Sequence, residues 1–423
     1  MRYLPGVIVT AFLGLMLLTF IPPPQSTIDL ARSHGFSENI IADGQQFSFE
    51  RRLFFWGVTL PELAWLLALV FGGWGKRLTD HCRRIARGRW LPTLLLLGVC
   101  LYLAQALIHL PFDVGRWAHL TAWGMTERPL SAWFAEYGLA LAVSAVIEGI
   151  VVVGLYLLLR WLPRGWWLAA TAGSVLLAMM FAFLWPILIS PLFNTFTPIG
   201  QTQWAAWETP LHKLIEKANV PARAILVMNA SSQSKHSNAY FAGFGATQRI
   251  VIFDNLLAKN KLPEVESVLA HEIGHWHHAH IVKGIALGGL AALVGFYLLA
   301  RLLQWAQGAM NLSGPSDPAG LPLILLAGFL ATWCVLPIGN AVSREFERQA
   351  DMMALELARE PDVFIEMEKK LAIDNIGNVT PAPWNVWLFS THPPTVERIK
   401  MAEKNPSTTS DPNFQVVSSN SIG

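Results

Sequence analysis

Long apolar stretches constrain the fold of this chain more than any other feature. A helix needs about 20 apolar residues to cross roughly 30 Å of hydrocarbon, and seven stretches of the sequence have about that length or more. Backbone polar groups in lipid must be paired within their own segment, which restricts such stretches to helices. The seven stretches are Tyr3–Pro22, Leu53–Gly75, Trp90–Leu110, Gly138–Trp161, Trp166–Ile189, Ile281–Leu303 and Leu321–Ile338.

The composition agrees with a multi-pass integral membrane protein. Hydrophobic residues make up 53% of the chain and charged residues only 14%, whereas about a quarter of a soluble domain is charged. The net charge of +2 gives no sign of a nucleic-acid partner, and we expect none. The three cysteines, Cys82, Cys100 and Cys334, are too far apart in the sequence to suggest a disulfide framework or a cysteine metal site.

The first apolar stretch has two interpretations. Arg2 followed by an apolar run is typical of a signal peptide. The stretch lacks a clean cleavage site of small residues and ends in Pro22-Pro23-Pro24. We therefore expect a helix that is retained in the mature protein.

Two polar regions, residues 191–270 and 343–404, are large enough to fold outside the bilayer. In the first region we expect a helix with Thr209 as its N-cap, a buried strand over Ala224–Met228, and a helix capped by Asp254. Between these elements, "NAYFAGF" and "QRIVIF" predict two strands joined by a turn at Gly245-Ala246-Thr247.

The first polar region ends in a metal-binding pattern, His271-Glu272-Ile273-Gly274-His275. On a helix, positions i and i+4 share one face, so both imidazoles can hold one zinc ion. Glu272 lies beside them, where it can take a proton from water at the metal. Pro263 marks the start of the helix, and we expect the helix to continue into the sixth apolar stretch.

A catalytic zinc site needs a third protein ligand, and the best source is "SREFERQAD" in the second polar region. Glu347 could bind the metal, while Asp351, four residues later, could fix the tautomer of a ligand imidazole. The spacing alone does not show whether Glu347 or Glu345 is the third metal ligand. A charged run after a membrane span is also typical of a solvated helix face. For His277, His278 and His280, contacts around the metal site or at the membrane interface are favoured over direct ligation.

Four motifs occur in the order found in the Ste24-type CAAX prenyl proteases of the M48 metallopeptidase family: "HSNAYFAGFGATQRIVIFDNLL", "VLAHEIGHWHHAH", "SREFERQAD" and "STHPPTVERI". The resemblance covers roughly residues 109–402. It implies a mainly α-helical membrane protein with seven helices around a hollow intramembrane chamber. A zincin-like metalloprotease domain with a small β-sheet would close one end. Glu62 and Glu148 lie inside apolar stretches, and a wet chamber would accommodate their carboxylates.

The resemblance also assigns roles to individual residues. It implies one Zn²⁺ per chain, held by His271, His275 and Glu347, with Glu272 as the general base. The remaining matches are His392 and Arg398, expected to face the reaction centre, Asn238 and Ala239, expected to pair with substrate, and His280, which matches a family histidine near the metal.

Together the patterns and the resemblance give an expected organisation of the chain. Residues 1–190 would form five transmembrane helices, 191–280 the zincin-like domain with the metal-binding helix, and 281–340 the last two transmembrane helices. Residues 341–404 would complete the catalytic domain, and 405–423 have the composition of a disordered tail.

The expected activity is zinc-dependent cleavage of peptide bonds near the membrane, with CAAX-type processing of prenylated or membrane-associated proteins. The partners would be a peptide or protein, with or without a lipid modification, and membrane lipid. The alternatives are a general quality-control protease for membrane proteins, a site-2-type intramembrane protease and a non-catalytic seven-helix transporter or receptor. The site-2 type places its motif and an aspartate ligand within spans, whereas this motif lies in a polar stretch.

Basic residues indicate how the chain is oriented, because Lys and Arg concentrate in cytoplasmic loops. With seven spans, Arg2, the loop after the second stretch and the loop after the fourth lie on one side, and the catalytic domain lies on the other. The first side carries Lys76, Arg77, Arg83, Arg84, Arg87, Arg89, Arg160 and Arg164 in its two loops. The opposite loops carry Arg32, Arg51, Arg52, Arg116 and Arg128.

The charge rule predicts a catalytic domain outside the cytoplasm, whereas the Ste24-type resemblance implies a cytosolic one. We adopt the charge rule for this chain. A reporter enzyme that works only outside the cytoplasm, fused after Lys404, should therefore be active. Silence of this fusion, together with activity of a cytoplasmic reporter at the same site, would show the orientation that the resemblance implies.

Overall fold

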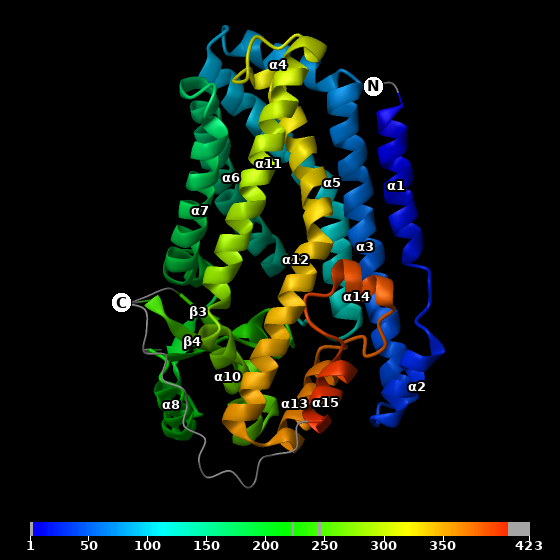
Figure 1. The fold of residues 1–423 in the computed structure, drawn as a ribbon, viewed down its shortest axis with the longest axis vertical. Coiled ribbons are helices and arrows are strands. Elements are labelled where there is room, and N and C mark those ends of the chain that lie inside the picture. The colour runs from blue at the N-terminus through cyan, green and yellow to red at the C-terminus, as the bar shows by residue number, and fades with distance from the viewer. Residues whose placement is uncertain (1–2, 222–223, 244–246, 405–423) are drawn as a thin grey trace.

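The structure is a computed structural model that describes residues 3–221, 224–243 and 247–404 (Figure 1). Within these residues, six helices are long and apolar enough to cross a membrane. Their bounds confirm the second to seventh predicted spans, although several helices extend beyond the apolar run. The six are α3 (Glu38–Phe71), α5 (Trp90–Ala122), α6 (Leu130–Trp161), α7 (Trp166–Leu184), α11 (His280–Met310) and α12 (Leu321–Ala358).

The first predicted span forms α1 (Leu4–Leu18), which is apolar but shorter than the other six helices. It ends just before Thr19, whose hydroxyl accepts a hydrogen bond from Trp56 of α3 at 2.8 Å. Phe12 is buried against Phe329 and Trp333 of α12. The first expected span is thus a short helix packed on the outside of the bundle (Figure 1).

The two ends of the helix bundle differ in character. At one end lies the amphipathic helix α4 (Trp74–Ile85), which carries much of the basic loop (Figure 1). At the other end lie α2 (Gln25–Ser33), the β-sheet and the helices of the polar regions. Residues 74–89 therefore lie at the end of the molecule opposite the metal-binding motif, as the orientation argument requires.

The first polar region contains a four-stranded sheet in the order β1-β2-β4-β3. The strands are β1 (Phe196–Pro198), β2 (Ile225–Met228), β3 (Ala239–Ala242) and β4 (Arg249–Phe253). β2 and β4 are parallel, while β3 pairs antiparallel with β4 and forms one edge. The three predicted strands are present, and the predicted turn between β3 and β4 lies largely outside the described residues.

Two predicted helix caps in this region are wrong. Helix α8 (Glu208–Lys217) begins one residue before Thr209, so this side chain lies within the first turn. Helix α9 (Asp254–Lys259) begins at Asp254 itself. The Asp254 carboxylate accepts hydrogen bonds from the backbone and hydroxyl of Ser231, which ties α9 to the preceding loop.

The metal-binding helix does not continue into the membrane, contrary to our expectation. Helix α10 (Leu262–His277) ends at His277, with His278 as its C-cap, and α11 begins at His280. Ala279 between them has a φ of 52°, a left-handed conformation that a continuous helix does not tolerate. The break lets α10 change direction and lie along α12.

Both polar regions contribute to one hydrophobic core, although two membrane helices separate them in the sequence. Ile199, Leu211 and Leu269 from the first region share this core with Phe364 and Ala402 from the second. The second region consists of the last part of α12, followed by α13 (Pro361–Asp374), α14 (Pro383–Phe389) and α15 (Thr395–Lys404). Among the described residues, further short helical turns lie at Trp185–Ile189, Ser190–Leu192, Ile199–Gln201, Ala205–Trp207, Ala230–Ser232 and Pro318–Gly320.

Gly274 allows α10 and α12 to approach each other closely. A Cβ atom at this position would lie 2.7 Å from the Cα of Ala350 and 2.9 Å from its carbonyl oxygen. Ala350 is fully buried on α12, between Glu347 and Asp351. Any side chain at position 274 would therefore push apart the two helices that carry the candidate metal-binding residues.

We predict that Gly274→Ala destabilises the catalytic domain. Alanine normally stabilises a helix interior by about 0.5–1 kcal/mol relative to glycine, but here the new methyl group meets backbone, and overpacking costs about 1–3 kcal/mol. Thermal unfolding of the purified protein should show a lower midpoint. The matched control is Gly328→Ala on α12, where the added Cβ meets nothing within 4 Å. Equal midpoints for the two variants would contradict the prediction.

Candidate active site and metal centre

Three side chains converge where α10 crosses α12. The Nε2 atoms of His271 and His275 lie 3.1 Å apart. The Glu347 carboxylate lies 3.3 Å from His271 Nε2 and 3.4 Å from His275 Nε2. These three residues can present one ligand atom each to a shared metal ion. Glu345, the competing carboxylate, instead points to Arg348 and Gln349 on the exposed side of α12.

The spacing of these atoms fits a tetrahedral metal site. Ligands bound to zinc at about 2.0–2.1 Å in a tetrahedron lie about 3.3 Å from one another, close to the three separations observed. Glu347 Oε2 is buried and has no hydrogen-bond partner among the described residues. A buried carboxylate oxygen without a donor is costly, and a cation at this position would satisfy it.

Buried charges hold His271 in position. Its Nδ1 lies 2.8 Å from Asp351, and Asp351 also accepts hydrogen bonds from Arg398. Arg398 forms a further ion pair with Glu368. A hydrogen on Nδ1 donated to Asp351 leaves the lone pair of Nε2 free to face the metal position, an arrangement common around metal-bound imidazoles.

A second chain of contacts sets the tautomer of His275. The amide nitrogen of Gln349 donates to Glu345 at 3.1 Å, so its oxygen faces His280 Nε2 at 3.2 Å. A carbonyl oxygen only accepts, so His280 must carry its hydrogen on Nε2. His280 Nδ1 then accepts from His275 Nδ1 at 2.9 Å. This leaves the Nε2 lone pair of His275 free for the metal.

Glu272 lies beside the metal position and next to the edge strand. Its carboxylate accepts a hydrogen bond from the backbone N–H of Phe241 in β3 at 3.1 Å. Burial raises the pKa of Glu272, and the neighbouring His271 and His275 oppose the rise. A raised pKa suits a group that must accept a proton and release it again near neutral pH.

The structure gives different surroundings to His392 and Arg398, both of which were expected to face the reaction centre. His392 lies 3.3 Å from Glu347, and its side chain is 59% exposed. Arg398 forms ion pairs with Asp351 and Glu368, and its guanidinium lies over the ring of Phe364. His392 is therefore free to meet a substrate, whereas Arg398 supports the metal-binding residues.

A cleft of about 760 Å³ joins these groups to the edge of the sheet. His271, Glu272, His392 and Arg398 line it together with Asn238. The side chain of Asn238 accepts a hydrogen bond from the N–H of Ala239, the first residue of β3. Because β3 is an edge strand, its outer side can pair with an extended peptide.

Sequence reasoning missed three residues of this site: Gly274, Gln349 and Glu368. The glycine lies within the recognised pattern, but its packing on Ala350 has no local sequence signal. Gln349 lies four residues after Glu345, a spacing that places both on one helix face, and this could have indicated their contact. Glu368 belongs to a separate helix, α13, and only the tertiary fold brings it to Arg398.

The comparisons with known proteins agree along most of the chain. Residues 36–195 match the profile described as CAAX prenyl protease N-terminal, five membrane helices, and residues 203–405 match peptidase family M48. An uncharacterized metalloprotease, YhfN, of Bacillus subtilis is 30% identical over 86% of this chain and 85% of the relative. The CAAX prenyl protease 1 homolog of Oryza sativa is 32% identical over 54% of this chain and 53% of the relative.

The fold is also shared with a solved structure. The crystal structure of Ste24p from S. mikatae has a TM-score of 0.83 with 21% sequence identity, covering 94% of this chain and 98% of that chain. The human CAAX prenyl protease 1 homolog is 29% identical to this chain, and the match covers 56% of the human protein. This chain belongs to the Ste24-type, membrane-integral metalloendopeptidases of peptidase family M48.

Proposed function

We propose that the chain binds one zinc ion through His271, His275 and Glu347 and cleaves peptides near the C-terminus of membrane-associated proteins. The observation that carries this proposal is the set of three ligand atoms spaced as in a tetrahedral site. CAAX-type substrates, with or without a prenyl group, are suggested by the names of the relatives. A fully protein-lined tetrahedron would be structural, but three ligands leave a position open for substrate and water.

In the proposed reaction, Glu272 is the general base. When bound, zinc polarises the scissile carbonyl and lowers the pKa of water towards neutral. Glu272 takes the proton of the attacking water and returns it to the leaving amine. The N–H of Phe241 holds the Glu272 carboxylate at the edge of β3, where an extended substrate would lie.

The remaining residues bind and orient the substrate in this proposal. Asn238 and Ala239 would pair with the peptide backbone along the outer edge of β3. His392 would donate a hydrogen bond to the oxygen that becomes negatively charged in the tetrahedral intermediate. Arg398, through Asp351, would orient His271 without touching the substrate. Asp351 and His280 would each fix the tautomer of one ligand imidazole.

The proposed organisation follows the expected division at residues 190, 280, 340 and 404. Residues 191–280 and 341–404 share one core, which supports their assignment to one catalytic unit. Because the helices break at Ala279, the metal position in this proposal would lie beside the first turn of α11. A peptide attached to a membrane-bound protein could therefore reach the cleft without leaving the bilayer surface. The expected tail, 405–423, lies outside the described residues.

We predict that purified protein contains about one equivalent of zinc per chain, as three protein ligands and one open position imply. His271→Ala should lose most of this metal, because two remaining ligands hold zinc poorly. His277→Ala, on the exposed side of the same helix, should keep it. Elemental analysis of the three proteins tests the prediction. Full occupancy in a His271→Ala, His275→Ala double variant would disprove the site.

We further predict that the protein cleaves prenylated CAAX peptides and that Glu272→Gln lowers kcat by about 10²–10⁴-fold, the usual contribution of a general base. The variant should retain its zinc. Glu266→Gln, also on α10 but outside the cleft, is the control and should stay active. A Glu272→Gln rate near that of the wild type would assign the proton transfer to another group. Cleavage of misfolded membrane proteins but not of prenylated peptides would instead favour a quality-control protease.

A further inference from the structure

The catalytic cleft opens into a second cavity, which we call the arginine pocket. This cavity of about 560 Å³ is lined by Arg51 and Arg52 of α3, Arg116 of α5 and the loop before α15. It shares Arg51, Gly377, His392 and Thr395 with the cleft. The two cavities therefore adjoin, and His392 forms part of both walls.

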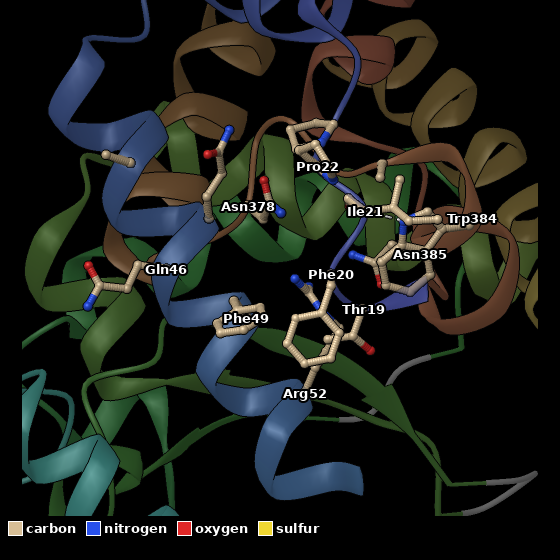
Figure 2. A pocket seen from close by; sticks show the side chains of 14 residues that line it. Thr19, Phe20, Ile21, Pro22, Gln46, Phe49, Arg52, Asn378, Trp384 and Asn385 are labelled. Carbon is tan, nitrogen blue, oxygen red and sulfur yellow. Dashed lines mark hydrogen bonds between the residues drawn. The ribbon is translucent and has the colours of Figure 1, made fainter. Parts of the chain in front are cut away.

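On its other side the arginine pocket adjoins a third cavity, of about 440 Å³, between α3 and the segment after α1. Figure 2 shows Arg52 among the side chains of this third cavity, together with Phe49, Trp384 and Asn385. Arg52 and Asn385 line both cavities. Arg52 is therefore accessible from two sides.

Positive charge in the arginine pocket is not neutralised within the protein. Among the described residues that line the pocket, none is Asp or Glu. In the part of the chain that the structure describes, Arg51 has no hydrogen bond or ion pair, and its guanidinium lies 5.7 Å from the centre of the Phe47 ring. Arg116 is paired only with Asp113 of its own helix, at 3.5 Å. The arginines are thus available to bind an anion.

Arg52 is held in place but lacks a charged partner. One of its terminal nitrogens donates to Ser48 at 2.6 Å, and the guanidinium lies 5.6 Å from the centre of the Trp384 ring. Its Nε is buried and has no hydrogen-bond partner among the described residues. A buried N–H without an acceptor is unfavourable. A carboxylate is the acceptor whose two oxygens match the fork of an arginine.

The position of α3 relative to the catalytic domain is fixed by backbone packing. A Cβ atom on Gly44 would overlap the carbonyl oxygen of Gly377, so only glycine permits this contact. One residue later, Gln45 donates to Thr380 at 2.8 Å. Arg51 and Arg52 follow two turns along the same helix. They are therefore held at a defined distance from the catalytic groups.

The arginine pocket begins one side chain away from the metal position. His392 contacts the metal-binding Glu347 at 3.3 Å and also lines the pocket. A peptide with its scissile bond at Glu272 could therefore extend past His392 and bring its terminal carboxylate into this pocket.

We propose that the arginine pocket binds the free C-terminal carboxylate of the substrate, with Arg51 and Arg52 as the residues that recognise it. The proposal rests on the proposed peptidase function and adds a rule for where the chain is cut. Anchoring the carboxylate at a fixed distance from Glu272 selects bonds close to a chain end and disfavours internal bonds. A lipid phosphate could also meet two arginines, but the shared wall with the cleft favours the substrate end.

The test compares two peptides that differ only at the end. One is a prenylated CAAX peptide with a free carboxylate, and the other is its carboxamide. We measure kcat/KM for both on zinc-loaded wild type, Arg51→Gln, Arg52→Gln and the control Arg32→Gln. Arg32 is an exposed arginine on α2 that is already paired with Asp29 and Glu38. Dissociation constants of fluorescent versions are measured on Glu272→Gln enzyme, which separates binding from cleavage.

The wild type and Arg32→Gln should prefer the carboxylate by about tenfold to a hundredfold, as expected for one charge-assisted hydrogen-bonding group. Arg51→Gln and Arg52→Gln should bring this ratio towards one, both in kcat/KM and in binding. Equal use of both peptides by the wild type would overturn the proposal while leaving the peptidase function intact. Cleavage of neither peptide would instead contradict the proposed function, and the binding ratio would still decide the role of the pocket.

A separate measurement distinguishes the lipid alternative. Binding of vesicles with and without phosphatidylglycerol is compared for the wild type and the two arginine variants. If the variants lose binding to anionic vesicles but keep the preference for the carboxylate peptide, the pocket is a lipid headgroup site and the proposal is wrong. Unchanged vesicle binding together with a lost carboxylate preference supports recognition of the substrate end.

Discussion

The contact between Gly274 and Ala350 is the constraint on which the rest of the site depends. His271 and His275 lie on α10, and Glu347 lies on α12, so the metal position exists only where these helices nearly touch. The space for a methyl group at position 274 is already filled by the backbone of α12. Helices that pack through ordinary side chains are 8–10 Å apart, and a glycine at the crossing permits a closer approach. Ligand atoms 3.1–3.4 Å apart are the result.

Buried charges then keep the ligands in one orientation. Asp351 and Arg398 are held together in a nearly water-free setting, and Glu368 supplies the second negative charge for the arginine. Removing one charged side chain from such a network leaves its partner as an uncompensated buried charge, which is strongly unfavourable. The network therefore gives His271 a fixed tautomer. The contacts from Glu345 through Gln349 and His280 do the same for His275, so each imidazole is oriented from a different side of α12.

The sequence predicted those parts of the protein that are specified by a pattern of nearby residues. Apolar runs of membrane length predicted six helices, short apolar runs predicted three strands, and the i, i+4 spacing predicted both the histidine pair and the Glu347–Asp351 pair. The break at Ala279 was not predictable in this way, because alanine favours helix, whereas its backbone here is left-handed. The caps at Thr209 and Asp254 failed for a related reason. Asp254 accepts hydrogen bonds from Ser231, which is distant in sequence, as well as from the N–H of the next residue, Asn255.

Groups that act together but come from distant segments are beyond the reach of any local pattern, and α3 illustrates why this matters. Its apolar half belongs to the membrane bundle, while its first turns pack on the loop between α13 and α14 through Gly44 and Gln45. The same helix thus positions Arg51 and Arg52 relative to groups more than 200 residues away in the sequence. The metal-binding helix is uncoupled from its own membrane span by the break at Ala279. The catalytic domain is therefore aligned with the membrane bundle chiefly through α3 and α12, and these two helices carry the arginines and the proposed third metal ligand.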